Sequence, residues 1–134
     1  MSTATLTTSR SLEHACLAAK VCDDLRAKDT IVLDLTGITP LFDYFVISTG
    51  NSRRQMAAIA DEVRRTLKRY GSKSRGVEGV ESSKWIVQDF GDVIVHVFTD
   101  EARGLYDLEH LWGDAPRVDW TELVDRFVDE DDAA

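Results

Sequence analysis

Cysteine and proline are scarce in this chain, with two of each among its 134 residues. Cys16 and Cys22 are six positions apart on a predicted helix, which separates them by about 120° around the helix axis. They therefore cannot form a disulfide with each other there. No second Cys or His completes the spacing of a metal site. We expect two buried thiols, no metal and no cofactor.

The sequence also lacks a long apolar run. No stretch approaches the roughly 20 residues that span a bilayer, and residues 1–10 lack the apolar centre of a signal peptide. These absences predict no membrane association and a cytoplasmic location. The chain has 134 residues, of which 43% are hydrophobic, and this is enough for one domain with a sizeable core.

Basic residues are outnumbered by acidic ones, 16 to 24, which gives a net charge of −8. This balance disfavours binding to nucleic acid through the whole surface and suits a basic partner. The charges are nevertheless segregated along the chain. Residues 53–75 contain eight basic and two acidic residues, whereas residues 85–112 contain six acids and a single arginine, Arg103. We expect a bipolar molecule.

Residues 85–98 form the clearest motif, two apolar strands joined at Gly91-Asp92, which is typical of a two-residue hairpin loop. That turn pairs Phe90 with Val93, Asp89 with Ile94, Val87 with His96, and Trp85 with Phe98. Paired residues share a sheet face, so one face carries Trp85, Asp89 and His96. Such a set is unusual for a core and suits a docking surface.

The remaining elements alternate between helix and strand. We predict helices over 11–28, 52–70, 100–107 and 121–128, and strands over 31–35, 43–49 and 75–77 besides the hairpin. Ser52 with Gln55 fits a capping box, and Gly71 fits a left-handed C-terminal cap. The fold class is α/β, with a mixed sheet of about five strands flanked by helices.

Catalytic motifs are weak. Gly50-Asn51-Ser52 between a strand and a helix resembles the opening of a nucleotidyltransferase fold, but a capped helix start explains it fully. Those enzymes need closely spaced acids to hold Mg²⁺. Asp61 and Glu62 are adjacent on a helix and diverge by about 100°, and Asp89 and Asp92 flank a turn. The acid cluster that those enzymes need is therefore missing, and we predict no enzyme.

The acidic, aromatic stretch carries the strongest signal. It holds Trp85, Arg103, Tyr106 and Trp112, residue types that dominate interface energetics. From composition alone, completion of the core by the two tryptophans is an equally good explanation. The basic residues of the 52–70 helix offer a second kind of contact, with RNA phosphates, although such residues are more often simply solvated.

Several segments together resemble the ribosomal silencing factor family, also called RsfS or Iojap. They follow one another in the expected order over about residues 10–114. The resembling segments are Asp43-Tyr-Phe-Val-Ile-Ser-Thr-Gly-Asn-Ser52, Glu78-Gly79, Trp85-Ile-Val-Gln-Asp89, Gly91-Asp-Val-Ile-Val-His96, Glu101-Ala-Arg103 and Tyr106-Asp-Leu-Glu-His-Leu-Trp112. Residues 1–9 are expected to be a flexible N-terminus, and residues 115–134 an extension with a short amphipathic helix and an acidic tail.

The resemblance implies a nucleotidyltransferase-like mixed α/β sheet without the catalytic acids of those enzymes. It also implies binding to the large ribosomal subunit through its protein L fourteen. The bound factor would block joining of the small subunit when nutrients are short, and the free protein would form a homodimer. An acidic, aromatic surface suits a basic ribosomal protein, with ribosomal RNA as a secondary contact. The residues expected on or directly beneath this surface are Trp85, Asp89, His96, Glu101, Arg103 and Tyr106.

Overall fold

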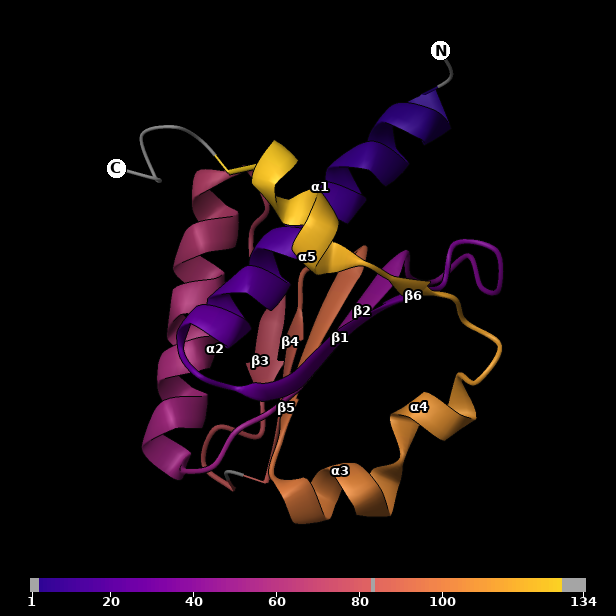
Figure 1. Ribbon diagram of the computed structural model, residues 1–134. Helices are drawn as coiled ribbons and strands as arrows, with labels where there is room; N and C mark the ends of the chain where they lie inside the picture. Colours follow the sequence, from indigo (N-terminus) through magenta and orange to yellow (C-terminus); the bar gives the residue numbers. More distant parts are fainter. Residues whose placement is uncertain (1–2, 83, 129–134) are drawn as a thin grey trace.

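One mixed β-sheet runs through the molecule, with helices on both of its faces (Figure 1). The computed structural model describes residues 3–82 and 84–128. The strand order is β3-β4-β5-β2-β1-β6, in which β2 and β5 are parallel and the other neighbours antiparallel. The strands are β1 (Lys28–Asp34), β2 (Tyr44–Thr49), β3 (Gly76–Glu78), β4 (Trp85–Asp89), β5 (Val93–Phe98) and β6 (Arg117–Val118). The helices are α1 (Thr3–Asp24), α2 (Arg53–Arg69), α3 (Asp100–Tyr106), α4 (Leu108–Leu111), α5 (Trp120–Leu123) and the 3₁₀ turn η1 (Val124–Arg126).

The structure confirms the predicted hairpin residue by residue. Trp85 pairs with Phe98, Val87 with His96 and Asp89 with Ile94. The turn is closed by the Phe90 amide, which donates to the Val93 carbonyl at 3.0 Å. Gly91 has φ +91°, a backbone conformation that glycine adopts without steric cost.

Both ends of α2 agree with the sequence. The Ser52 hydroxyl accepts from the Gln55 amide at 3.1 Å, while the Gln55 side chain accepts from the amide of Asn51, one residue earlier than a standard capping box. At the other end the Ser72 amide donates to Leu67 and the Gly71 amide to Lys68, which is a Schellman motif. Gly71 has φ +93°, as its predicted capping role requires.

The bounds of α1 differ from the prediction at both ends. The helix begins at Thr3 rather than residue 11, and it ends at Asp24 rather than 28. Its C-terminal end is another Schellman motif, in which Arg26 holds φ +70° and the Ala27 amide donates to the Cys22 carbonyl. Glycine usually marks such an end, and because arginine stands here the sequence has no stop signal.

One face of the sheet packs under α1, α2 and α5 (Figure 1). Its core includes Val46, Val95 and Val97 from the strands and Ile59 and Val63 from α2, all fully buried. The thiols of α1 belong to this core as expected. Burial raises the pKa of Cys16 to about 11 and that of Cys22 to about 12, so both thiols stay protonated at neutral pH.

Residues 115–128 are part of this fold rather than an appendage. β6 pairs with β1 and adds a sixth strand where about five were predicted. Trp120 and Val124 are buried in the helix-covered core, and the Trp120 indole donates to the Thr30 carbonyl at 3.0 Å. A two-residue strand has no periodicity to detect, which is why the sequence missed it. None of the helices among the described residues is long and apolar enough to cross a bilayer.

Candidate docking surface

The second face of the sheet carries an aromatic cluster that α3 and α4 cover only in part. Trp85 stacks on Phe98 with ring centroids 4.9 Å apart, and the ring of Tyr106 lies 4.6 Å from Trp85 and 6.4 Å from Phe98. Phe45 contacts His96 at 4.6 Å and Trp112 at 5.7 Å. We call Phe45, Trp85, His96, Phe98, Tyr106 and Trp112 the aromatic face.

Trp85 and His96 are joined by a hydrogen bond that orients both rings. The indole Nε1 donates to His96 Nδ1 at 3.1 Å, so the imidazole is neutral and carries its proton on Nε2. Burial lowers the pKa of His96 to about 4, which agrees with a neutral ring. His96 therefore positions a neighbour, as predicted from the sequence, and the bond does not involve proton transfer.

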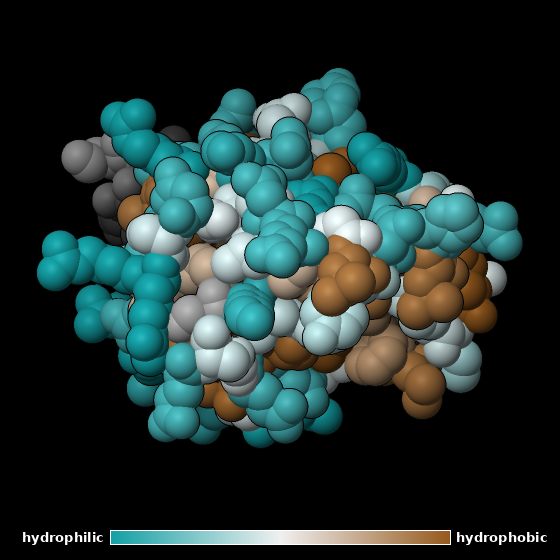
Figure 2. Space-filling view, turned by 90° about the horizontal axis from the view of Figure 1, so that it is seen from below, coloured by the Kyte–Doolittle hydropathy of each residue, from teal (hydrophilic) through white to brown (hydrophobic). Residues whose placement is uncertain are grey.

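Large apolar side chains project from α3 and α4 beyond this cluster. Leu105 is 76% exposed, Leu111 is 71% exposed and Tyr106 is 52% exposed. Figure 2 views the molecule from below, the side on which α3 and α4 lie in Figure 1, and shows hydrophobic side chains gathered on its right-hand half. Exposed apolar groups that lie together mark binding surfaces more often than isolated ones do.

Arg103 holds this layer on the sheet. Its Nε donates to the Glu109 carboxylate at 2.7 Å, and its Nη1 donates to the Asp29 carbonyl and to the Thr49 hydroxyl, each at 2.8 Å. Its side chain is only 12% exposed. The Arg103 guanidinium thus connects α3 with α4 through Glu109, and with β1 and β2 through Asp29 and Thr49. Arg103 supports the surface from beneath and does not lie on it.

The predicted acidic residues occupy different places. Glu101 is exposed in the first turn of α3, close to the aromatic face. Asp89 is also exposed, and its carboxylate accepts from the Gly91 amide at 2.7 Å in the hairpin turn. Asp89 shares a sheet face with Trp85 but stands four residues along β4, about 13 Å away at 3.3 Å per residue. The structure therefore does not bring Asp89 into the cluster.

Two parts of the surface were missed by the sequence analysis. Leu105 and Leu111 were not singled out, although their exposure is the strongest sign of an unpartnered surface. The signal for them was that the short helices α3 and α4, of seven and four residues, carry more large apolar side chains than such short helices can bury. Phe45 was also missed, because it comes from β2 and joins the face only through the sheet register.

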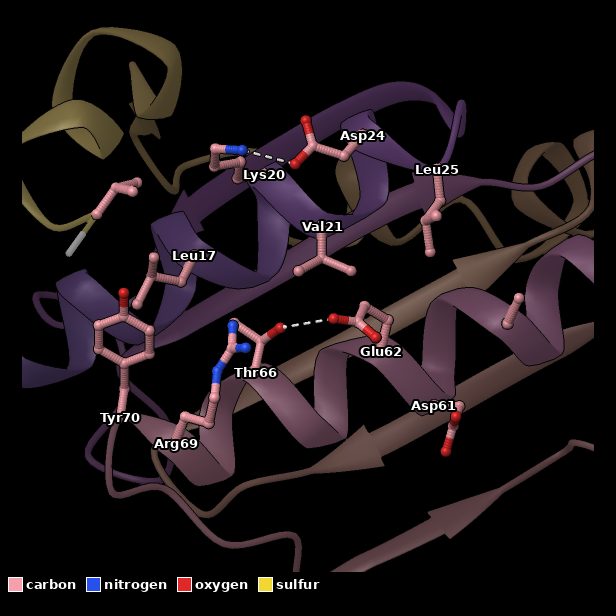
Figure 3. Close-up of a pocket in the computed structure, with 12 residues that line it drawn as sticks. Leu17, Lys20, Val21, Asp24, Leu25, Asp61, Glu62, Thr66, Arg69 and Tyr70 are labelled. Carbon is pink, nitrogen blue, oxygen red and sulfur yellow. Dashed lines mark hydrogen bonds and ion pairs between the residues drawn. The ribbon is translucent and has the colours of Figure 1, made fainter. Parts of the chain in front are cut away.

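A hollow of about 480 Å³ lies between α1 and α2. Figure 3 shows Leu17 and Val21 of α1, and Leu25 just after its end, facing α2 across it. Some charged groups at its edge pair within their own helix, with Lys20 bonded to Asp24 at 2.6 Å. This hollow is the seam between two packed helices. Among the described residues, no group of three or more His, Cys, Asp and Glu side chains lies close enough together to hold a metal ion.

Taken with the sheet topology, these contacts define a small mixed α/β domain with an aromatic, partly acidic surface. The chain belongs to the ribosomal silencing factor family. The sequence model of that family, described as "Ribosomal silencing factor during starvation", matches residues 8–134. The match includes residues 115–134, which the sequence analysis had placed beyond the shared region.

Individual relatives agree with this assignment. The chain is 46% identical over 103 residues to ribosomal silencing factor RsfS of Bacillus subtilis, covering 77% of this chain and 87% of the relative. It matches a crystal structure of a Chromobacterium violaceum protein with a TM-score of 0.72 and 42% identity, over 75% of this chain and 84% of that one. A mouse protein named "Mitochondrial assembly of ribosomal large subunit protein 1" is 32% identical over 89 residues, covering 64% of this chain and 39% of that protein. Membership indicates a ribosome-associated role in silencing translation.

Proposed function

We propose that this protein binds the large ribosomal subunit through protein L fourteen and sterically prevents joining of the small subunit when nutrients are short. Family membership supports the ribosomal setting and the link to starvation. The name of the mouse relative points to the large subunit. In this proposal the factor is a cytoplasmic regulator that acts by occupying a surface, and it catalyses no reaction.

The observation that carries the proposal is the layer of exposed apolar residues above the aromatic face. Leu105, Tyr106 and Leu111 are all more than half exposed, and Glu101 and Asp107 beside them are exposed acids. Burial of apolar surface would supply the affinity. The carboxylates would attract a basic ribosomal protein and orient it during the encounter.

Trp85 and His96 have supporting roles in this arrangement. Trp85 is partly buried beneath Tyr106, so it presents Tyr106 to the partner and forms the floor of the contact. Aromatic residues packed at the centre of an interface contribute most to binding, often 2 kcal/mol or more each by alanine substitution, as an order of magnitude. Arg103 keeps α3 in place for the same contact.

We also propose that the free protein forms a homodimer through this face. Two copies would cover each other's exposed leucines, and the ribosome would then compete with the second copy for one apolar patch. The apparent affinity for large subunits would fall as protein concentration rises above the dimer dissociation constant. An apparent affinity that is independent of protein concentration would contradict the shared surface.

Co-sedimentation with isolated large subunits, followed by addition of small subunits, tests the proposed function. Wild-type protein is expected to sediment with large subunits and to reduce the amount of joined ribosomes. Tyr106→Ala, an exposed position, should weaken both effects, whereas charge reversal of Arg64, Arg65 and Lys68 on α2 should leave them largely intact. Binding without any loss of joining would refute the silencing mechanism. Calorimetry with nucleoside triphosphate and Mg²⁺ tests the alternative of a nucleotidyltransferase, for which we expect no binding.

A further inference from the structure

A second cavity, of about 590 Å³, lies at the other end of the sheet from the aromatic face. It is bounded by α1, the turn after α2, the start of β3 and the β4–β5 hairpin, and its lining includes Arg10, Lys73, Arg75 and Asp92. β5 connects the two regions, since it begins beside Asp92 and ends at Phe98 in the aromatic face. In Figure 1 the end of α2 lies at the top and α3 at the bottom.

The lining of the cavity contains three cations and one carboxylate. Arg10, Lys73 and Arg75 are exposed, and none of them forms an ion pair with any residue that the structure describes. The carboxylate in the lining, Asp92, accepts a hydrogen bond from the Ser11 hydroxyl, which also reaches Asp43. The lining therefore keeps an excess of positive charge, in a chain whose net charge is −8.

Two tight turns position the arginines. A Cβ placed on Gly91 would lie 2.7 Å from Cζ of Arg75, so this guanidinium rests directly against the glycine backbone of the hairpin turn. A Cβ on Gly71 would lie 3.5 Å from Nη2 of Arg10. Both glycines have positive φ and lie at chain reversals. Because they lack a Cβ, each guanidinium can pack against the backbone of a turn beside the cavity.

The basic face of α2 is less available to an anion. Asp61 pairs with Arg64 at 3.0 Å and with Arg65 at 3.1 Å, so one carboxylate already neutralises part of that charge. RNA contact was predicted from the sequence for this helix face. The distribution of ion pairs favours the cavity instead, because none of its three cations has such a partner among the described residues, whereas Arg64 and Arg65 on α2 both do.

We propose that this cavity binds phosphate groups of an RNA strand. Guanidinium and ammonium groups are the usual ligands of phosphate oxygens, and arginine matches them with two parallel hydrogen bonds. The proposal deepens the ribosomal function proposed above and rests on it for the choice of RNA. A site at the opposite end of the sheet leaves the aromatic face free, so the protein can hold RNA and a ribosomal protein together.

Binding of a fluorescently labelled single-stranded RNA, followed by anisotropy across a range of salt concentrations, tests the proposal without ribosomes. The test variant is Arg10→Ala/Lys73→Ala/Arg75→Ala, and the matched control is Arg64→Ala/Arg65→Ala/Lys68→Ala. Each triple removes three exposed positive charges, so the change in net charge is the same. Thermal melting of both variants reports whether they remain folded, which we expect because surface substitutions rarely matter to stability.

The cavity triple should weaken RNA binding. It should also make the slope of log K against log salt shallower by about 2, because each lost phosphate contact on a single strand contributes roughly 0.7 to that slope. The α2 triple should change both much less. Equal effects of the two triples, or a larger effect of the α2 triple, would overturn the assignment. Failure of the Tyr106→Ala test would count against the protein-binding face alone, because this assay contains no ribosomal protein.

Competition separates the two sources of phosphate. At constant ionic strength, inorganic phosphate at the same phosphate concentration as the RNA should displace little of it, since one phosphate ion reaches only part of the cavity. Full displacement would assign the cavity to a free anion and refute RNA as its ligand.

Discussion

Each face of the sheet buries one polar side chain from the hairpin, and the two are anchored differently. On the helix-covered face, Gln88 donates from Nε2 to the Ala60 carbonyl at 2.7 Å, which ties β4 to the backbone of α2. On the other face, His96 accepts from the indole of Trp85, a side chain that is itself partly exposed. One hydrogen bond locks two elements together, and the other orients a side chain near the surface.

The covering layers differ in the same sense. Helix α2 contributes six buried residues, five of them apolar, whereas α3 buries Ala102 alone and α4 buries none. A layer that hides so little of its apolar surface contributes little to folding and leaves that surface for a partner. We infer that one face stabilises the domain and the other serves binding. Substitutions on the two faces should therefore affect stability and binding differently.

Trp120→Ala should have the largest effect, and it should act on stability. The indole fills the helix-covered core and donates to the Thr30 carbonyl, so its removal leaves a cavity and an unpaired carbonyl. We expect a loss of about 3–5 kcal/mol in the free energy of unfolding, measured by urea denaturation. The affinity of the remaining folded protein for large subunits should not change. A loss below about 1 kcal/mol would show that the C-terminal segment is only loosely attached.

His96 should make stability fall in mild acid. Because burial lowers its folded pKa to about 4 from 6.5, only the unfolded chain takes up this proton between those values. The contribution is complete above pH 6.5 and is lost as the pH falls to 4, by about 3 kcal/mol in total. His96→Gln keeps an acceptor for Trp85 but does not titrate, so denaturation curves from pH 7 to pH 4 should be flatter for this variant. Parallel pH profiles of the two proteins would contradict a buried neutral imidazole.

Arg103→Lys should loosen α3 without removing any exposed residue. An ammonium group cannot reach the Glu109 carboxylate, the Asp29 carbonyl and the Thr49 hydroxyl together, as the guanidinium does. We expect a stability loss of about 2 kcal/mol and a weaker affinity for large subunits. Hydrogen exchange in residues 100–111 reports the local effect, and unchanged protection there would argue against this anchoring role.

Glu101→Gln and Asp89→Asn should have the smallest effects, below about 1 kcal/mol each on ribosome binding, because both carboxylates are exposed. Glu101 lies beside the aromatic face, so Glu101→Gln should lower the association rate at low salt. The difference from wild type should disappear as salt is raised. Asp89 stands at the hairpin turn and should matter less than Glu101. Stopped-flow association kinetics rank the two, and the reverse order would place the contact nearer the hairpin.

The sequence predicted those parts of the structure that rest on local rules. Alternation and a Gly-Asp turn determined the hairpin register, and Ser52 and Gly71 marked both ends of α2. Prediction from the sequence failed at the end of α1 and at β6, where these local rules do not apply. Arg26 takes the left-handed position that glycine usually occupies, and β6 is too short for any periodicity.

The candidate site was predictable only in part, because residue types indicate a surface but not its layering. Trp85, His96 and Tyr106 were expected together and do lie together. The outermost position of Leu105 and Leu111 depends on how two short helices are oriented on the sheet, which no local pattern in the sequence determines. The same holds for the cavity, since Arg10 and Arg75 are 65 positions apart in the chain and meet only in the fold.

Whether the exposed leucines of α3 and α4 bind the ribosome can be decided by measuring the affinity of Leu105→Glu/Leu111→Glu for isolated large subunits, with Val77→Glu as the control. Val77 is also an exposed apolar residue, at 48%, but it pairs with Gln88 and so belongs to the opposite face of the sheet. We expect about a hundredfold weaker binding for the double variant, because two apolar contacts are lost and two charges are added at the interface. We expect near wild-type binding for Val77→Glu. Wild-type affinity in the double variant, or an equal loss in the control, would show that the ribosome is bound elsewhere.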